Sequence, residues 1–174
     1  MNVRRTGAGF CLVAVTALVG YARFFWPGAY GPTAGSSAKL HHRLPPLPVI
    51  DAAGKVVDLA QATRGSKSVI VFHSSSCPVC RTVLPELHPF PSSLKLLLVN
   101  EDSVSPAADR DQSGVAEALQ FSDPNRVLFR FFPMSFLPTV LFVDERGVLC
   151  EAWVGARMRG HLARRLIEFA DSEP

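Results

Sequence analysis

Two cysteines in the middle of the chain have the spacing of a thiol–disulfide redox pair. Cys77 and Cys80 are separated by two residues, so one helical turn would bring both sulfurs onto one face. They follow an apolar, β-branched run at 68–72 that is typical of a buried strand, and a helix is expected to begin near Cys77. Unpaired N–H groups at the start of a helix stabilise a thiolate. Cys77 should therefore be the exposed nucleophile, and Cys80 the more buried thiol that resolves a mixed disulfide.

The same two sulfurs could also serve other kinds of site. Zinc usually needs two further cysteines or histidines at recognisable spacing, and Cys11, Cys150, His73 and His88 do not form such a pair. A purely structural disulfide would close too small a loop to constrain the chain much. Soft thiolates do suit Cu(I), so a copper-binding metallochaperone remains the alternative. For the redox interpretation we expect no metal and no cofactor.

Interleaved strand and helix patterns around the pair predict an α/β fold. A second buried strand is expected at 94–100, and a helix kinked by Pro85 at 78–88. The patterns further predict a strand, a turn and a strand within 138–155, and an amphipathic closing helix within 159–170. This order favours a mixed central sheet with helices on both faces. The remaining expected elements are a β-hairpin around Gly54 before the sheet and short helices at 114–121 and 124–132.

The amino-terminal segment at 1–26 has the pattern of a membrane anchor or a signal sequence. Arg4 and Arg5 precede an uncharged run at 6–22, and three aromatic residues close the segment at 24–26. The run approaches the roughly 20 apolar residues that span a bilayer, and the positive-inside rule places the two arginines in the cytoplasm. We therefore expect a retained single-span anchor in a bacterial inner membrane, with the rest of the chain in the periplasm. A cleaved signal peptide is the alternative.

The rest of the chain divides into a linker and one folded domain. A segment at 27–45 is rich in Gly, Pro and Ser and lacks periodicity, which predicts a flexible tether. The folded domain is then expected at 46–172, as a monomer. The formal net charge of +3, from 18 basic and 15 acidic residues, is too small to indicate nucleic-acid binding.

Two stretches of the chain resemble thioredoxin-like proteins. The stretch VIVFHSSSCPVCRTVLPEL, residues 69–87, is similar to their active-site strand and helix. The stretch at 136–169 is similar to their carboxyl-terminal end, and Pro138 matches the family's cis-proline. The resemblance implies a thioredoxin-like fold over 46–172. It also implies catalytic Cys77 and Cys80, with an active-site loop and substrate groove formed by Pro78, Val79, Leu137, Pro138 and Thr139.

Within the family, the predicted anchor and hairpin look like the membrane-anchored TlpA/ResA type, and the Cys-Pro-Val-Cys motif is similar to the MauD type. This resemblance implies protein substrates with cysteine pairs or disulfides, such as apocytochromes, copper-site proteins or an amine dehydrogenase subunit. The chain also departs from the family. Val71 and Val83 stand where relatives carry carboxylates that accept the buried thiol's proton. His73 is a candidate substitute, but its position favours a strand-end histidine without a catalytic part.

Three further interpretations are less well matched. A thiol peroxidase needs a proline seven residues before the nucleophile, where Ile70 stands. Related copper-delivery proteins space their cysteines more widely and add a downstream histidine, which disfavours both a metallochaperone and a redox-inert thioredoxin-like binding module.

Cys150, in a predicted strand, is expected to act as a small hydrophobic residue without a redox part.

Overall fold

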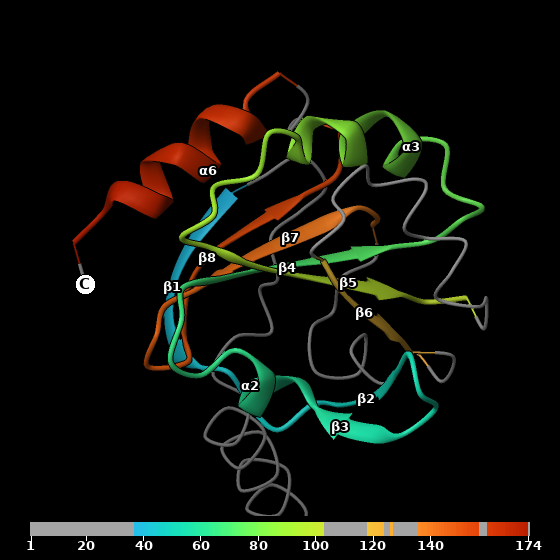
Figure 1. Cartoon of the computed structure of the whole chain (residues 1–174). Helices are drawn as coiled ribbons and strands as arrows, with labels where there is room; N and C mark the ends of the chain where they lie inside the picture. Colours follow the sequence, from blue (N-terminus) through green and yellow to red (C-terminus); the bar gives the residue numbers. More distant parts are fainter. Residues whose placement is uncertain (1–36, 103–117, 124–125, 127–135, 157–159, 174) are drawn as a thin grey trace, which may run out of the picture. The chain divides into compact units, whose positions relative to one another are not determined.

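A mixed β-sheet forms the centre of the structure (Figure 1). The computed structural model describes residues 37–102, 118–123, 126, 136–156 and 160–173. Within these residues, eight strands form one sheet in the order β1-β8-β7-β4-β5-β6-β2-β3. β4 is parallel to β5 and β5 to β6, whereas the other neighbours are antiparallel. The strands are β1 (Ser37–Arg43), β2 (Pro48–Asp51), β3 (Val56–Asp58), β4 (Ser68–His73), β5 (Lys95–Asn100), β6 (Leu119–Ser122), β7 (Thr139–Val143) and β8 (Val148–Val154).

Alternating side chains of the central strands pack into two apolar layers, one on each face of the sheet. Every residue of β4 is buried, as expected for its continuous β-branched run. Val69 and Val71 belong to the layer that also holds Cys80, whereas Ile70 and Phe72 belong to the opposite layer. Because side chains alternate along a strand, β4 is anchored from both faces, and the loop that follows it starts from a rigid point.

Helices cover both faces of the sheet, so the predicted α/β architecture with a mixed sheet is confirmed (Figure 1). On the face of Val71 lie α3 (Cys80–Val83), the 3₁₀ helix η1 (Leu84–Leu87) and α6 (Leu162–Asp171). On the other face lies α2 (Leu59–Ala62), which buries Leu59 and Ala60. The layer that holds the cysteine pair is therefore built from α3, η1 and α6 against the central strands.

The segment around Gly54 joins β2 to β3. These two strands pair antiparallel, and Gly54 takes φ = +81°, a conformation that glycine adopts without steric cost. Asp58 then ends β3 and begins α2, because its Oδ1 accepts hydrogen bonds from the N–H groups of Leu47 (2.9 Å) and Ala60 (3.0 Å). One carboxylate thus caps the helix and fixes the approach to β2.

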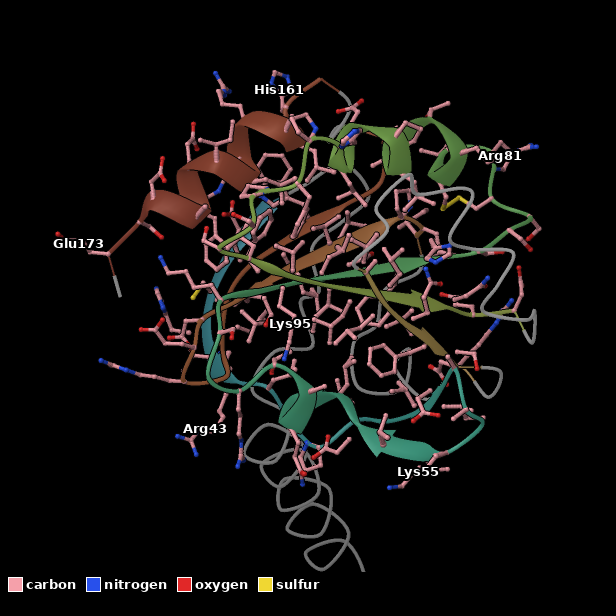
Figure 2. All side chains as sticks on the ribbon, viewed as in Figure 1. Arg43, Lys55, Arg81, Lys95, His161 and Glu173 are labelled. Carbon is pink, nitrogen blue, oxygen red and sulfur yellow. A yellow bond between two sulfur atoms is a disulfide. The ribbon has the colours of Figure 1, made fainter. Side chains whose placement is uncertain are left out.

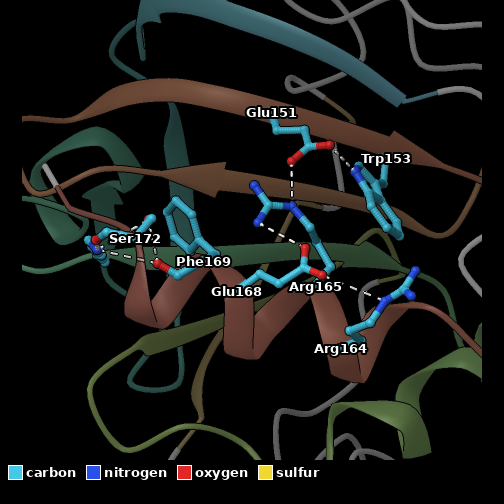
Figure 3. A network of polar contacts seen from close by, with 8 residues as sticks. Glu151, Trp153, Arg164, Arg165, Glu168, Phe169 and Ser172 are labelled. Atoms are coloured by element: carbon cyan, nitrogen blue, oxygen red, sulfur yellow. Dashed lines mark hydrogen bonds and ion pairs between the residues drawn. The ribbon is translucent and has the colours of Figure 1, made fainter.

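A polar network holds α6 on the sheet (Figure 3). Arg165 Nε donates to Glu151 Oε2 at 2.7 Å, and Trp153 Nε1 donates to Oε1 of the same carboxylate at 2.5 Å. The Arg165 guanidinium also lies 5.4 Å from the centroid of the Phe142 ring and 5.9 Å from that of Phe169, within cation–π range. Both oxygens of the largely buried Glu151 are thereby paired, as a carboxylate out of water requires.

The carboxyl-terminal end of α6 is capped by Lys67, so Lys67→Met should lower the free energy of unfolding. Lys67 Nζ donates to the carbonyl oxygens of Phe169 and Ala170, both at 3.3 Å, and to that of Ser172. A cation on these unpaired carbonyls also interacts favourably with the helix dipole. Since hydrogen bonds to charged groups contribute about 1.5–3 kcal/mol, we expect a loss in that range in urea unfolding. Lys55→Met, in an exposed turn, is the matched control and should change little.

Two segments differ from their predicted structure. Residues 37–43, expected within the tether, form β1, which pairs antiparallel with β8. Residues 119–121, expected in the helix at 114–121, belong to β6 (Leu119–Ser122), which lies between β5 and β2. In both cases backbone pairing with strands remote in sequence overrides a local pattern that lacked strand alternation. The helix predicted at 124–132, apart from Arg126, and the anchor or signal sequence predicted at 1–26 fall outside the described residues. Among the described residues, no helix is long and apolar enough to cross a bilayer.

Candidate redox site

Cys77 and Cys80 form a disulfide at the end of β4 where the chain enters α3 (Figure 2). Their Cα atoms are 5.3 Å apart, within the range of disulfides. Cys80 is completely buried in the apolar layer of Val71, whereas Cys77 packs at the border of this layer and is only partly buried. One sulfur is therefore open to a partner and the other lies behind it.

The helix expected near Cys77 begins three residues later, and it is short. α3 starts at Cys80, and from Leu84 the chain continues as η1, which contains Pro85 near its start. A proline ring removes one backbone donor and crowds the preceding turn, which explains the change of helix type. The charge of a long helix dipole is therefore not what stabilises the Cys77 sulfur. Instead, the N–H of Cys80 donates to Cys77 Sγ at an N···S distance of 3.0 Å.

A second loop reaches the same end of the sheet. The peptide bond between Leu137 and Pro138 is cis, which confirms the cis-proline expected there. Thr139 begins β7 opposite Phe72 of β4, and its Oγ1 donates to the carbonyl oxygen of Phe136 at 2.9 Å. The N–H of Gly155 donates to the carbonyl oxygen of Pro138 at 2.8 Å. The loop is thus fixed on both sides.

Several of the predicted groove residues lie at the same end of the sheet as the disulfide. Leu137 and Val79 pack, with Cys77, against the apolar layer that buries Cys80. Pro78 is exposed between the two cysteines, and Phe136 is 47 % exposed next to the cis-proline loop. The end of the sheet that carries the accessible sulfur therefore also carries partly exposed apolar side chains.

The cysteine pair and the cis-proline loop are features of a known domain type. The family model described as a thioredoxin-like domain matches residues 53–170. The chain belongs to this thioredoxin-like family. A comparison with curated protein sequences found no match.

Solved structures support the thioredoxin-like fold. A Chlorobium tepidum protein assigned as thiol:disulfide interchange protein DsbE has a TM-score of 0.62 at 22 % identity, covering 75 % of this chain and 97 % of that one. A secreted Mycobacterium tuberculosis disulfide oxidoreductase homologous to DsbE has a TM-score of 0.57 at 16 % identity, with coverages of 70 % and 95 %. A thiol peroxidase from Chromobacterium violaceum also has a TM-score of 0.57, at 19 % identity, with coverages of 81 % and 90 %. Since these folds carry more than one activity, the chemistry must be argued from the site itself.

Two positions near Cys80 are valines where the resemblance to thioredoxin-like proteins suggests carboxylates. Val71 and Val83 are fully buried in the layer of Cys80. His73 is 1 % exposed and ends the same strand two residues after Val71, so strand alternation directs it to the face of Cys80. The expectation that it is a strand-end histidine without a catalytic part stays a prediction.

Sequence reasoning missed the carboxylates that follow β5. Asp102 Oδ2 accepts hydrogen bonds from the serine loop that leads from β4 to Cys77. Glu101 is 6 % exposed, and this burial raises its pKa to about 7, against the lowering effect of Arg126 at 3.6 Å. The order of the strands could have indicated that these carboxylates lie near Cys77. Acidic residues directly after a strand parallel to β4 must lie at the edge of the sheet where Cys77 lies.

Cys150 lies away from this site. It is half-buried on β8 next to Leu149, whose partner Val143 ends β7 at the edge of the sheet opposite the cis-proline loop. Burial raises the pKa of the Cys150 thiol, which makes it a poor nucleophile. These observations agree with the expected structural part of this cysteine.

Proposed function

We propose that this chain is a thiol–disulfide oxidoreductase acting on cysteine pairs of other proteins. The observation that carries the proposal is the disulfide between a partly exposed Cys77 and a fully buried Cys80. Such a pair can exchange with a disulfide at its open sulfur, while the buried sulfur is shielded from other reactants.

The exchange runs through a mixed disulfide. In the reduced chain, the Cys77 thiolate attacks one sulfur of the client disulfide, which joins Cys77 to the client and releases the other client sulfur as a thiolate. Cys80 then loses its proton and attacks Cys77 Sγ. This step re-forms the internal disulfide and releases the second client sulfur. Two electrons pass from the chain to the client, and the reverse sequence oxidises a client dithiol.

Reduction of insulin disulfides tests the reaction. The full-length chain in detergent, supplied with dithiothreitol, should precipitate the insulin B chain faster than dithiothreitol alone. Pre-alkylation of the reduced chain with iodoacetamide should remove the acceleration. An unmodified chain that gives no acceleration over the thiol alone, and does not oxidise a reduced dithiol peptide either, would contradict the proposal.

We further propose that the domain works outside the cytoplasm, held at the inner membrane by residues 1–26. The support is the pair of arginines before an uncharged run and the aromatic residues that follow it. Fusion of alkaline phosphatase after Pro174 should give active phosphatase in a bacterial host, because this reporter folds only where disulfides form. Carbonate extraction should leave the protein in the membrane fraction if the segment is retained and release it if the segment is cleaved.

The clients are proposed to be envelope proteins with cysteine pairs, such as apocytochromes, copper-site proteins or an amine dehydrogenase subunit. The sequence features that suggest them are the predicted anchor and the Cys-Pro-Val-Cys motif. Expression of a Cys80→Ser variant in the native cells, followed by non-reducing electrophoresis and mass spectrometry, should trap the client on Cys77. Adducts with glutathione alone would contradict a protein substrate.

A further inference from the structure

The loop between β4 and Cys77 consists of three serines, which alone would not hold a fixed conformation. In the structure one carboxylate oxygen organises it. Asp102 Oδ2 accepts hydrogen bonds from Ser74 Oγ at 2.8 Å, from the Ser75 N–H at 2.9 Å and from Ser75 Oγ at 2.6 Å. These three bonds join residues 27 and 28 positions apart.

The serines pass this order on to the nucleophile. Ser74 Oγ also contacts Ser76 Oγ at 2.7 Å and accepts from the Ser76 N–H at 3.2 Å. The carbonyl oxygen of Ser74 accepts from the N–H of Cys77 at 3.2 Å. A continuous chain of hydrogen bonds therefore connects Asp102 with the backbone of Cys77, and so with the contact between Cys77 Sγ and the N–H of Cys80.

Asp102 is itself held firmly. Its N–H donates to Asn100 Oδ1 at 2.8 Å, and the N–H of Glu101 donates to the carbonyl oxygen of His73 at 3.0 Å. The ends of β4 and β5 are thereby tied together just before the loop. The bonds from Ser75 lower the pKa of Asp102, so the carboxylate is ionised at neutral pH.

We propose that Asp102 is a positioning residue of the redox site, which holds the Ser74–Ser76 loop so that Cys77 Sγ stays on the N–H of Cys80. This inference rests on the proposed redox function and adds a residue outside the two cysteines and the cis-proline loop. Its consequence is that loss of the carboxylate loosens the loop and weakens the stabilisation of the Cys77 thiolate.

The hydrogen bonds of Asp102 and its negative charge have opposite effects on the pKa of Cys77, which makes the proposal testable. Loss of the hydrogen bonds in Asp102→Ala should raise the pKa of Cys77 toward the value of a free thiol, about 8.5. Loss of a nearby negative charge alone would lower it. Asp102→Asn keeps an oxygen acceptor of the same size, so this variant should retain a pKa at or below the wild-type value.

The matched control is Asp144, which performs the same local task far from Cys77 and Cys80. Its Oδ1 accepts from the N–H groups of Arg146 at 3.0 Å and Val148 at 2.7 Å in the turn between β7 and β8. This turn lies at the edge of the sheet opposite Cys77, since β7 runs antiparallel to β4. Asp144→Ala should loosen a turn without affecting the redox site.

The experiment uses the full-length chain in detergent. The pKa of Cys77 is read from the pH dependence of its alkylation by iodoacetamide, followed by peptide mass spectrometry. The equilibrium of the Cys77–Cys80 disulfide with glutathione is measured in parallel. We expect Asp102→Ala to raise the pKa of Cys77 and to shift this equilibrium about tenfold toward the disulfide. Asp102→Asn should show little or none of this shift, and Asp144→Ala none.

Two outcomes would overturn the proposal. One is a pKa and an equilibrium that are unchanged in Asp102→Ala. The other is a lowered pKa in both Asp102 variants, which would mean that only the charge matters. If Asp102→Ala does not fold, Ser75→Ala removes one of the three bonds and should give the same shifts with smaller size. Both readouts use the chain's own cysteines, so they can be interpreted even if insulin is not a substrate.

Discussion

Replacing Cys77 with serine should abolish disulfide exchange by this chain, whereas replacing Cys80 should leave the first step intact. Cys77 is the sulfur that a client can reach, and Cys80 is fully buried behind it. A serine hydroxyl stays protonated at neutral pH and cannot form a mixed disulfide. With Cys77→Ser, insulin reduction should therefore fall to the rate of dithiothreitol alone.

The two variants control for each other. Each lacks the Cys77–Cys80 disulfide, so any change in stability from its loss affects both. Cys80→Ser should still react at Cys77 with a disulfide reagent and accumulate the mixed disulfide, because no resolving thiol is present. Cys77→Ser should not react in this way. Cys150→Ser, at the remote edge of the sheet, should behave as wild type in turnover.

The reverse pattern would contradict the assignment of roles. If Cys80→Ser failed to form a mixed disulfide while Cys77→Ser formed one, the buried sulfur would be the nucleophile. Exchange at the wild-type rate in both variants would place the activity elsewhere in the chain. Stopped-flow reaction with a chromogenic aromatic disulfide, at matched unfolding midpoints, distinguishes these cases.

The parts of the fold that local pattern determines were predictable. β4 and β5 are continuous apolar strands, and in the structure they are the parallel pair at the centre of the sheet. The closing helix was predicted from its amphipathic face, and α6 buries Leu162 and Leu166 as expected. In these segments propensity, periodicity and burial agree, so a single sequence is sufficient.

The parts that depend on contacts between remote segments were not predictable. β1 and β6 form because strands elsewhere in the chain offer unpaired edges, and neither segment shows strand alternation of its own. The site follows the same rule. The Cys-x-x-Cys pair and Pro138 are visible in the sequence, but the bonds from the serine loop to Asp102 require β4 and β5 to be placed side by side first.

A second large effect is expected from Glu101, whose burial should make the stability of the domain depend on pH. The carboxyl is 6 % exposed, and its Oε1 has no hydrogen-bond partner among the described residues. Desolvation is the main cause that raises its pKa from 4.5 to about 7. Among its charged neighbours, Asp123 and Asp102 raise the pKa further and Arg126 lowers it.

Proton linkage gives the direction in which the stability of the domain changes with pH. Between pH 4.5 and about 7 the folded chain keeps the proton on Glu101, whereas the unfolded chain has lost it. Stability therefore falls as pH rises through this window, since the unfolded state binds fewer protons. One pKa unit corresponds to about 1.4 kcal/mol, so the whole difference is about 3 kcal/mol. This loss of stability is absent below pH 4.5 and complete above pH 7.

Glu101→Gln should remove this dependence, because the amide cannot ionise and has nearly the same shape. Urea unfolding at pH 5 and pH 8 should show the variant gaining on wild type at pH 8 by up to about 3 kcal/mol, less the lost attraction to Arg126. Glu145→Gln, an exposed carboxylate in the β7–β8 turn, is the matched control and should leave the wild-type difference between the two pH values in place. An equal pH dependence in wild type and Glu101→Gln would show that Glu101 is ionised in the folded chain throughout. The end of β5 would then hold two negative charges beside the loop that carries Cys77, rather than one.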